Sequence, residues 1–357
     1  MAARVKTHGA PGPQAGAAET NAFLAACRCQ PAPHRPIWIM RQAGRYLPEY
    51  RELRARVSFE QLIRTPELAA EATLQPLKRF ELDAAILFSD IMTPVQGLGV
   101  ALSFEPGPVV REPIRTRAQI ETLPELVPQR DVPFVLDTVR LVRAGLPRGA
   151  PLIGFAGAPF TLLCYLVSGR PSKEFAQARA FLYAQSADAQ RLLERLADAM
   201  AAYLAAQAAA GAQALMLFES WAGLLAPREF AAFALPAVRR TLAPLRSLGV
   251  PLIYYVNQGS VLMPAVAGLD VDVVGVDWRA SLTRVRRVLG PDKAVQGNLD
   301  PAALFAPPEE LRRCAQAVLD EAGASPGHIF NLGHGIWPDT DPDAVARLID
   351  CVHAYRR

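Results

Sequence analysis

Lysine is scarce in this sequence of 357 residues, since only four of its 38 basic residues are lysines and the others are arginines. Arginine is the better side chain for bidentate capture of carboxylates. A GC-rich genome would also explain the excess of arginine, together with the abundant alanine. We prefer that explanation for most of the arginines, so only those in a defined motif count as evidence for a ligand.

Signals for secretion, disulfide bonding and membrane insertion are missing as well. The first twenty residues lack the apolar core of a signal peptide. The five cysteines are an odd number with scattered spacing, which argues against a disulfide framework and fits a reducing compartment. The alanine-rich stretch 174–210 contains charged residues and is not expected to span a membrane. We therefore expect a soluble, cytoplasmic protein with no membrane partner.

Strong charge is also missing, because the net charge is only +4. A nucleic-acid-binding protein would show a denser basic patch, so the balance fits an acidic small molecule better. A hydrophobic content of 51% excludes a disordered chain, and 31 prolines without a glycine period exclude a collagen-like one.

Short apolar runs recur along the chain, and each is followed by polar or glycine residues. Continuous runs of this length are typical of strands buried on both faces of a parallel sheet. Helical patterns lie between them, two of which end at Gly290 and Gly323, and Thr20 or Asn21 is placed to cap a first helix. The predicted strands are residues 84–88, 151–155, 214–218, 251–256, 271–276, 293–296 and 328–331.

Seven strands alternating with helices predict an α/β fold, a single-domain (β/α)8 TIM barrel with an N-terminal extension. The eighth strand is either residues 38–40 or part of 100–110. We expect residues 1–19 to form a flexible tail and residues 20–357 to form the barrel.

In such barrels the active site is built from residues that follow the strands. Here that set includes Asp90, Ser220 and His334, the last between two glycines. It contains no lysine for a Schiff base and no histidine, cysteine or glutamate cluster for a metal, so we predict no metal. Cys27 and Cys29 have no zinc spacing. The sequence also lacks a dinucleotide or P-loop fingerprint.

The segment 36–54, PIWIMRQAGRYLPEYRELR, places Arg41 and Arg45 four residues apart around Gly44. Two convergent guanidinium groups need an anion, such as a polycarboxylate or a phosphate. The alternative is a surface helix in which Arg45 pairs with Glu49.

Six motifs then become informative together. They are RQAGRYLPEYR, FSDIMTP, GFAGAPFTLLCYLVSG, FESWAG, QGNLDP and FNLGHGI, spread over about residues 20–353. In this order and spacing they resemble the uroporphyrinogen decarboxylase family of haem biosynthesis. Glu219 departs from the family, which usually has aspartate in the FDSWAG motif.

The resemblance implies a cofactor-free lyase, usually a homodimer, on a TIM barrel. It would remove the carboxyl group from four acetate side chains of uroporphyrinogen III and yield coproporphyrinogen III. Position by position, the resemblance assigns a catalytic carboxylate to Asp90. It assigns the other substrate contacts to Arg41, Gln42, Ala43, Gly44, Arg45, Tyr165, Ser220 and His334.

The chemistry of the residues agrees with this assignment. A porphyrinogen with eight carboxylates and four pyrrole N–H groups needs cations at its rim and an acceptor at its centre. The general acid stays open: a positioned water or His334 is chemically easier than an arginine. Without the resemblance, Tyr165 fits a core or rim residue and Ser220 a helix cap. We treat His8, His34, His328 and His353 as structural or surface residues.

Two rival interpretations remain. Corrinoid-dependent methyltransferases resemble this barrel, but they hold zinc with a His-x-Cys pair, and no histidine here is followed two residues later by cysteine. A carrier for tetrapyrroles or polyanions would need the rim arginines only, so Asp90 would be superfluous. Turnover separates a carrier from an enzyme.

Overall fold

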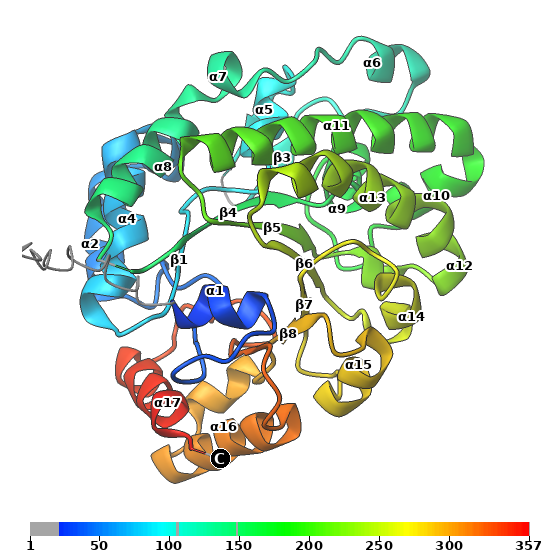
Figure 1. Cartoon of the computed structure of the whole chain (residues 1–357). Helices are drawn as coiled ribbons and strands as arrows, with labels where there is room; N and C mark the ends of the chain where they lie inside the picture. Colours follow the sequence, from blue (N-terminus) through cyan, green and yellow to red (C-terminus); the bar gives the residue numbers. More distant parts are fainter. Residues whose placement is uncertain (1–20, 105–106, 148, 357) are drawn as a thin grey trace, which may run out of the picture.

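A computed structural model describes residues 21–104, 107–147 and 149–356. The predicted flexible tail at 1–19 lies outside the described residues. Seven parallel strands form one sheet in the order β1-β4-β5-β6-β7-β8-β9, which curls into a barrel (Figure 1). These strands are β1 (Ala85–Ile86), β4 (Leu152–Gly157), β5 (Ala214–Glu219), β6 (Leu252–Val256), β7 (Val273–Val276), β8 (Ala294–Gln296) and β9 (His328–Ile329).

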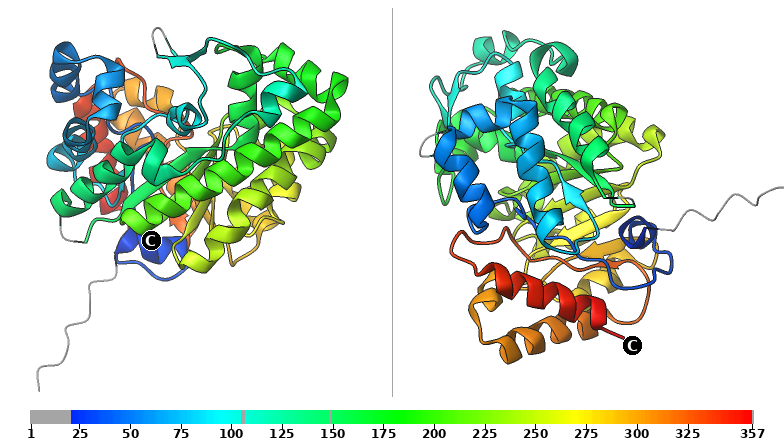
Figure 2. Two further views of the ribbon diagram at one scale, coloured as in Figure 1. Left: turned by 90° about the horizontal axis from the view of Figure 1, so that it is seen from above. Right: turned by 90° about the vertical axis from the view of Figure 1, so that its left-hand side faces the viewer.

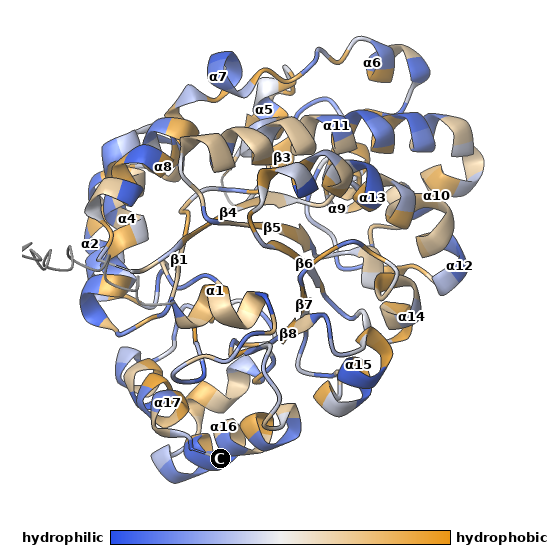
Figure 3. Ribbon diagram, in the orientation of Figure 1, coloured by the Kyte–Doolittle hydropathy of each residue, from blue (hydrophilic) through white to orange (hydrophobic). Residues whose placement is uncertain are grey.

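All seven predicted strands are confirmed. Every residue of β4, β6, β7 and β8 is buried, as continuous apolar runs covered on both faces require. Figure 3 shows these strands as hydrophobic, while the outer helices combine hydrophilic and hydrophobic faces.

The eighth position of the barrel is filled by the segment around Ile37. Ile37 forms a parallel bridge with Phe330 next to β9, and its carbonyl accepts a hydrogen bond of 2.9 Å from Asp83 N just before β1. The ladder stays short because Pro36 has no N–H to donate and the backbone turns at Arg41, whose φ is 64°. The alternative in 100–110 is wrong: β2 (Leu102–Ser103) and β3 (Val109–Val110) form a separate antiparallel pair.

Helices cover the outside of the barrel (Figure 1). Helical patterns between the predicted strands are confirmed, among them α10 (Ala176–Ala184), α11 (Ser186–Ala210), α15 (Leu282–Leu289) and α16 (Pro308–Ala322). Gly290 and Gly323 end the last two with φ of 82° and 77°, which glycine adopts without strain. The others of at least eight residues are α2 (Pro48–Arg56), α4 (Pro66–Arg79), α8 (Pro133–Gly145), α9 (Pro159–Ser168), α13 (Leu235–Leu242) and α17 (Pro342–Ala354).

The shorter helices lie in the connections between these elements. They are α1 (Ala22–Cys27), α3 (Phe59–Arg64), α5 (Thr93–Gly97), α6 (Arg117–Glu121), α7 (Pro128–Asp131), α12 (Pro227–Glu229) and α14 (Met263–Val266). No helix in the described ranges is long and apolar enough to cross a membrane.

Helix α1 closes the end of the barrel at which the strands begin. Asn21 caps it by accepting a hydrogen bond from Leu24 N, as the sequence predicts. The Asn21 side-chain amide also donates to the carbonyl of Gly149, just before β4, at 2.8 Å. The last helix, α17, packs beside α16 and brings the end of the chain to this same face (Figure 2). The opposite face, where the strands end, is therefore the one left for a ligand.

Candidate functional site

Asp90 lies four residues beyond β1, at the mouth of the barrel. Its Oδ1 accepts a hydrogen bond of 2.8 Å from Met92 N, which fixes the carboxylate at the start of the following turn. Burial raises the pKa of Asp90 above its ordinary value, and the Met92 N–H and the charge of Arg41 only partly offset that rise. Because this hydrogen bond uses only one acceptor position of the carboxylate, Asp90 can accept further hydrogen bonds from a ligand.

Arg41 begins the loop that follows the eighth barrel position. Its side chain lies against Gly335, where an added Cβ would come within 2.4 Å of Arg41 Cδ. Its charge acts on Asp90, Tyr165 and His334, because it lowers the pKa of each of the three. Any side chain at residue 335 would displace the arginine, so the glycine has a defined steric role here.

The alternative pairing of Arg45 with Glu49 does not occur. Glu49 binds Arg79 instead, with two hydrogen bonds of 2.7 and 3.2 Å. Arg41 and Arg45 are both exposed, and neither forms an ion pair with any residue of the described ranges. Two unpaired guanidinium groups in one loop fit the predicted anion better than the predicted surface helix.

Gln42 points away from the mouth. It is fully buried, its Oε1 accepts from Ile39 N at 3.2 Å, and its Nε2 donates to the carbonyl of Ala84 at 3.2 Å. These bonds satisfy one backbone N–H of the eighth segment and one backbone carbonyl beside β1. Ala43 and Gly44 are partly exposed between the two arginines. The Gln42 side chain thus shapes the loop and is not available to a ligand.

His334 sits between two closely packed glycines. An added Cβ at Gly333 would come within 2.3 Å of Trp278 N, so only glycine allows this approach. Tyr255 Oη donates to the Gly333 carbonyl at 2.8 Å and holds the loop. Burial, assisted by the charge of Arg41, lowers the pKa of His334 to about 4, so the imidazole is neutral near pH 7.

Tyr165 lies on α9, partly buried among aromatic rings. Its ring centroid is 5.4 Å from that of Phe175 and 6.5 Å from that of Trp221. Burial raises the pKa of its hydroxyl, so Tyr165 is a neutral hydrogen-bonding group at the mouth.

Ser220 is fixed by a buried network that the sequence did not predict. Thr161 Oγ1 accepts from Ser220 N at 2.8 Å and donates to Glu219 Oε1 at 2.5 Å. Burial raises the pKa of Glu219 to about 7. Thr161 follows β4 and Glu219 ends β5, so their positions at neighbouring strand ends were a usable signal.

Metal-type donor groups gather elsewhere. In the described part of the chain, the one cluster of three side chains suited to a metal ion is His34, Asp83 and His353. Asp83 precedes β1, so this cluster lies at the end of the barrel opposite Asp90. Both histidines, expected from the sequence to be structural or surface residues, share the carboxylate of Asp83, a contact that the sequence did not predict.

The fold and these side chains define an α/β-barrel enzyme whose mouth offers unpaired arginines, a partly buried carboxylate and neutral hydrogen-bonding groups. Comparison with known proteins makes the class specific. The uroporphyrinogen decarboxylase (URO-D) family model matches residues 18–355. The uroporphyrinogen decarboxylase of Syntrophotalea carbinolica is 49% identical over 331 residues, which cover 93% of this chain and 96% of that protein. That of Geobacter metallireducens is 46% identical, covering 93% and 98%. The chain belongs to the uroporphyrinogen decarboxylase family.

Solved structures agree on the fold. A methyltransferase from Methanosarcina mazei superposes with a TM-score of 0.78 at 20% identity, covering 94% of this chain and 98% of that one. A B12-independent methionine synthase from Shewanella gives a TM-score of 0.59 at 12% identity, covering 83% of this chain and 90% of that one. At these identities the likeness shows the barrel and nothing about the reaction.

Proposed function

We propose that this chain is a cofactor-independent uroporphyrinogen decarboxylase that converts uroporphyrinogen III into coproporphyrinogen III and four molecules of CO2. Membership of the family over nearly the whole chain supports the reaction. The observation that carries the assignment to particular residues is the placement of Asp90. It is a partly buried carboxylate at the mouth of the barrel, within electrostatic reach of Arg41 and Tyr165.

Binding is divided between charge and hydrogen bonds. Arg41 and Arg45 take carboxylates at the rim of the substrate, because both are exposed and lack an ion-pair partner in the described ranges. The carboxylate of Asp90 accepts from the pyrrole N–H groups at the centre. Tyr165, Ser220 and His334 add neutral hydrogen bonds. Ala43 and Gly44 contact the substrate through the backbone, and Gln42 acts only by holding the loop.

The chemical step needs an electron sink. Loss of CO2 leaves an electron pair on the methylene carbon, and a pyrrole protonated at the carbon beside the acetate accepts that pair. Asp90 stabilises the resulting cation, and it does so more strongly in a water-poor mouth than in bulk water. Since the pKa of His334 is about 4, the neutral imidazole is a poor acid source at pH 7. A positioned water is the better of the two candidates that the sequence left open.

We also infer a cytoplasmic homodimer that pairs through the mouths of the barrels. Three large apolar side chains in loops after β6, β8 and β9 are exposed, namely Val261 at 65%, Phe305 at 51% and Trp337 at 44%. The rings of Phe305 and Trp337 are 5.6 Å apart and form one apolar patch. The five free thiols suit a reducing compartment.

The experiment is an anaerobic incubation of metal-stripped protein with uroporphyrinogen III, with the products separated by carboxyl number after oxidation. We expect hepta- through tetracarboxylate products without any added cofactor. A carrier would bind the porphyrinogen stoichiometrically and return it unchanged, and that result would overturn the proposal.

Gel filtration of the same sample tests the dimer, and Trp337→Ser is expected to weaken it.

A further inference from the structure

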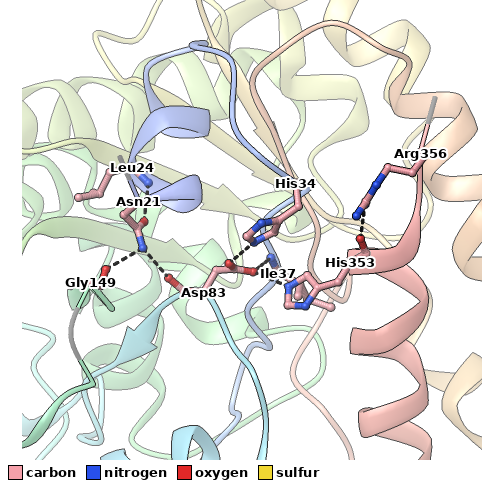
Figure 4. A network of polar contacts seen from close by, with 8 residues as sticks. All are labelled: Asn21, Leu24, His34, Ile37, Asp83, Gly149, His353 and Arg356. Carbon is pink, nitrogen blue, oxygen red and sulfur yellow. Dashed lines mark hydrogen bonds and ion pairs between the residues drawn. The ribbon is translucent and has the colours of Figure 1, made fainter. Parts of the chain in front are cut away.

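Three side chains from distant parts of the chain meet at the closed end of the barrel, as Figure 4 shows. His34 belongs to the segment after α1, Asp83 precedes β1, and His353 lies near the end of α17. His34 Nε2 is 2.6 Å from Asp83 Oδ1, and His353 Nε2 is 2.9 Å from Asp83 Oδ2. The two imidazole rings meet edge to face with their centroids 4.7 Å apart. One carboxylate therefore holds two imidazoles, one on each oxygen.

Asp83 is fixed before any ligand arrives. Its Oδ2 also accepts a hydrogen bond of 2.8 Å from Ile37 N. Burial by itself would raise the pKa of Asp83, but the hydrogen bonds from His353, Ile37 N and His34 outweigh it and lower that pKa below its ordinary value. The carboxylate is accordingly ionised at neutral pH, with its orientation set by the backbone.

Two imidazole nitrogens and one carboxylate oxygen are a ligand set typical of divalent transition metals. In each pair of Figure 4 the imidazole Nε2 and the carboxylate oxygen lie on facing sides, and the candidate donor atoms of the three residues lie within 4.8 Å of one another. A tetrahedral Zn2+ with the usual bond lengths would place each nitrogen about 3.4 Å from the oxygen. With one Asp83 oxygen as the ligand, the histidine already bound to that oxygen has to move away by less than about 1 Å. The other histidine, which is bound to the second oxygen, has to turn toward the first from within 4.8 Å.

The cluster has room to make that adjustment. The side chains of His34 and His353 are 31% and 22% exposed, while that of Asp83 is 10% exposed. Each of the two histidines can therefore rotate slightly, and the buried carboxylate can stay in place. His34 and Asp83 also line an open cleft of about 980 Å³, together with Lys78 and Glu81. The cleft supplies a route for the ion and space for a water molecule as a further ligand.

We propose that His34, Asp83 and His353 bind a divalent transition-metal ion such as Zn2+, which joins the segment after α1 to α17 at the closed end of the barrel. In the metal-free protein each Nε2 donates its hydrogen to Asp83. On binding, a neutral imidazole loses that proton to water and takes one up from water at Nδ1, so the Nε2 lone pair becomes free for the metal with no net release of protons. The site is structural, because Asp83 and Asp90 lie at opposite ends of β1. It is independent of the proposed decarboxylation.

The test is titration of Zn2+ into the metal-stripped full-length protein by calorimetry, with the thermal midpoint followed in parallel. We expect one ion per chain and a higher Tm with zinc. His34→Gln and His353→Gln, which leave the Asp83 bond to Ile37 N in place, should each weaken zinc binding roughly tenfold or more. Co2+ in place of Zn2+ should give visible absorption bands that both variants lose.

Two neighbours on α17 provide matched controls. Cys351→Ser removes a thiol two residues from His353, and Asp350→Asn removes an exposed carboxylate. Both variants should bind zinc as the unmodified chain does. The proposal is overturned if the unmodified chain binds no more zinc than the double variant His34→Gln/His353→Gln, or if Cys351→Ser abolishes binding. Either result would mean that the three side chains form only a hydrogen-bonded cluster and do not bind a metal ion.

Discussion

Two aspartates at opposite ends of β1 differ in almost every respect that decides their roles. Asp83, before the strand, accepts from two histidines and a backbone N–H, and its pKa is lowered. Asp90, after the strand, accepts one backbone N–H, and burial raises its pKa. The fold stabilises the ionised form of Asp83, whereas it destabilises the ionised form of Asp90 and so loses some stability there. A partly unsatisfied charge of this kind marks a site prepared for a ligand.

The largest expected effect concerns Asp90. Asp90→Asn keeps the size of the side chain but removes the charge that stabilises the protonated pyrrole, so we expect the decarboxylation rate to fall by about 10²–10³. The initial rate of heptacarboxylate formation under anaerobic conditions measures it. The exposed Asp350→Asn variant is the control and should keep full activity. A near-normal rate for Asp90→Asn would contradict the proposed role.

Arg41 should act mainly on binding. Arg41→Gln removes a charge-assisted bond to a substrate carboxylate, which is worth about 1.5–3 kcal/mol, so KM should rise roughly 10- to 100-fold with a smaller change in kcat. Steady-state kinetics separate the two constants. Arg287→Gln, which changes an exposed arginine on α15, should leave both constants alone. A fall in kcat with KM unchanged would instead place Arg41 in the chemical step.

Asp83 should affect the fold. Asp83→Asn weakens hydrogen bonds that tie the first and last segments to β1, and we expect the free energy of unfolding in metal-free protein to fall by about 1–3 kcal/mol. Urea denaturation followed by circular dichroism measures the change. An unchanged midpoint would show that the carboxylate does not hold the chain ends.

The smallest effect is a dependence of stability on pH. The pKa of His334 is about 4 and that of His328 about 3, both below the ordinary 6.5. Between about pH 6.5 and 4 the unfolded chain therefore binds more protons, and stability falls as the pH falls. Glu219, with a pKa of about 7, acts in the opposite direction. The Tm of the unmodified chain minus that of His334→Gln isolates the contribution of His334. This difference should become smaller as the pH falls from about 6.5 to 4, because only the unmodified chain loses the stability that the neutral imidazole contributes. A constant difference would contradict the lowered pKa.

The barrel was predictable because strands buried on both faces leave continuous apolar runs, and all seven runs became strands. The eighth position was ambiguous, since Pro36 and the turn at Arg41 leave only an isolated bridge at Ile37. Nothing in the sequence distinguishes that segment from the residues that form β2 and β3. A strand reduced to one bridge has no periodicity to detect.

Residue types at the mouth were predictable, but the directions of side chains were not. The motif placed Gln42 beside Arg41, yet its side chain turns into the interior, where it binds Ile39 N and the carbonyl of Ala84. The cluster of His34, Asp83 and His353 was missed because its members are far apart in the chain and meet only after the barrel closes. The spacing of residues along a chain predicts contacts within one helix, strand or loop. It does not predict contacts between distant segments that meet only when the barrel closes.

The contrast between the two aspartates is tested most directly by measuring both properties in both variants. Asp90→Asn should lose turnover and keep or raise its unfolding midpoint, since a carboxylate with a raised pKa opposes folding when it is ionised. Asp83→Asn should lower the midpoint and keep turnover per folded molecule. If both variants lose turnover and stability together, the division between a ligand-binding end and a closing end of the barrel is wrong.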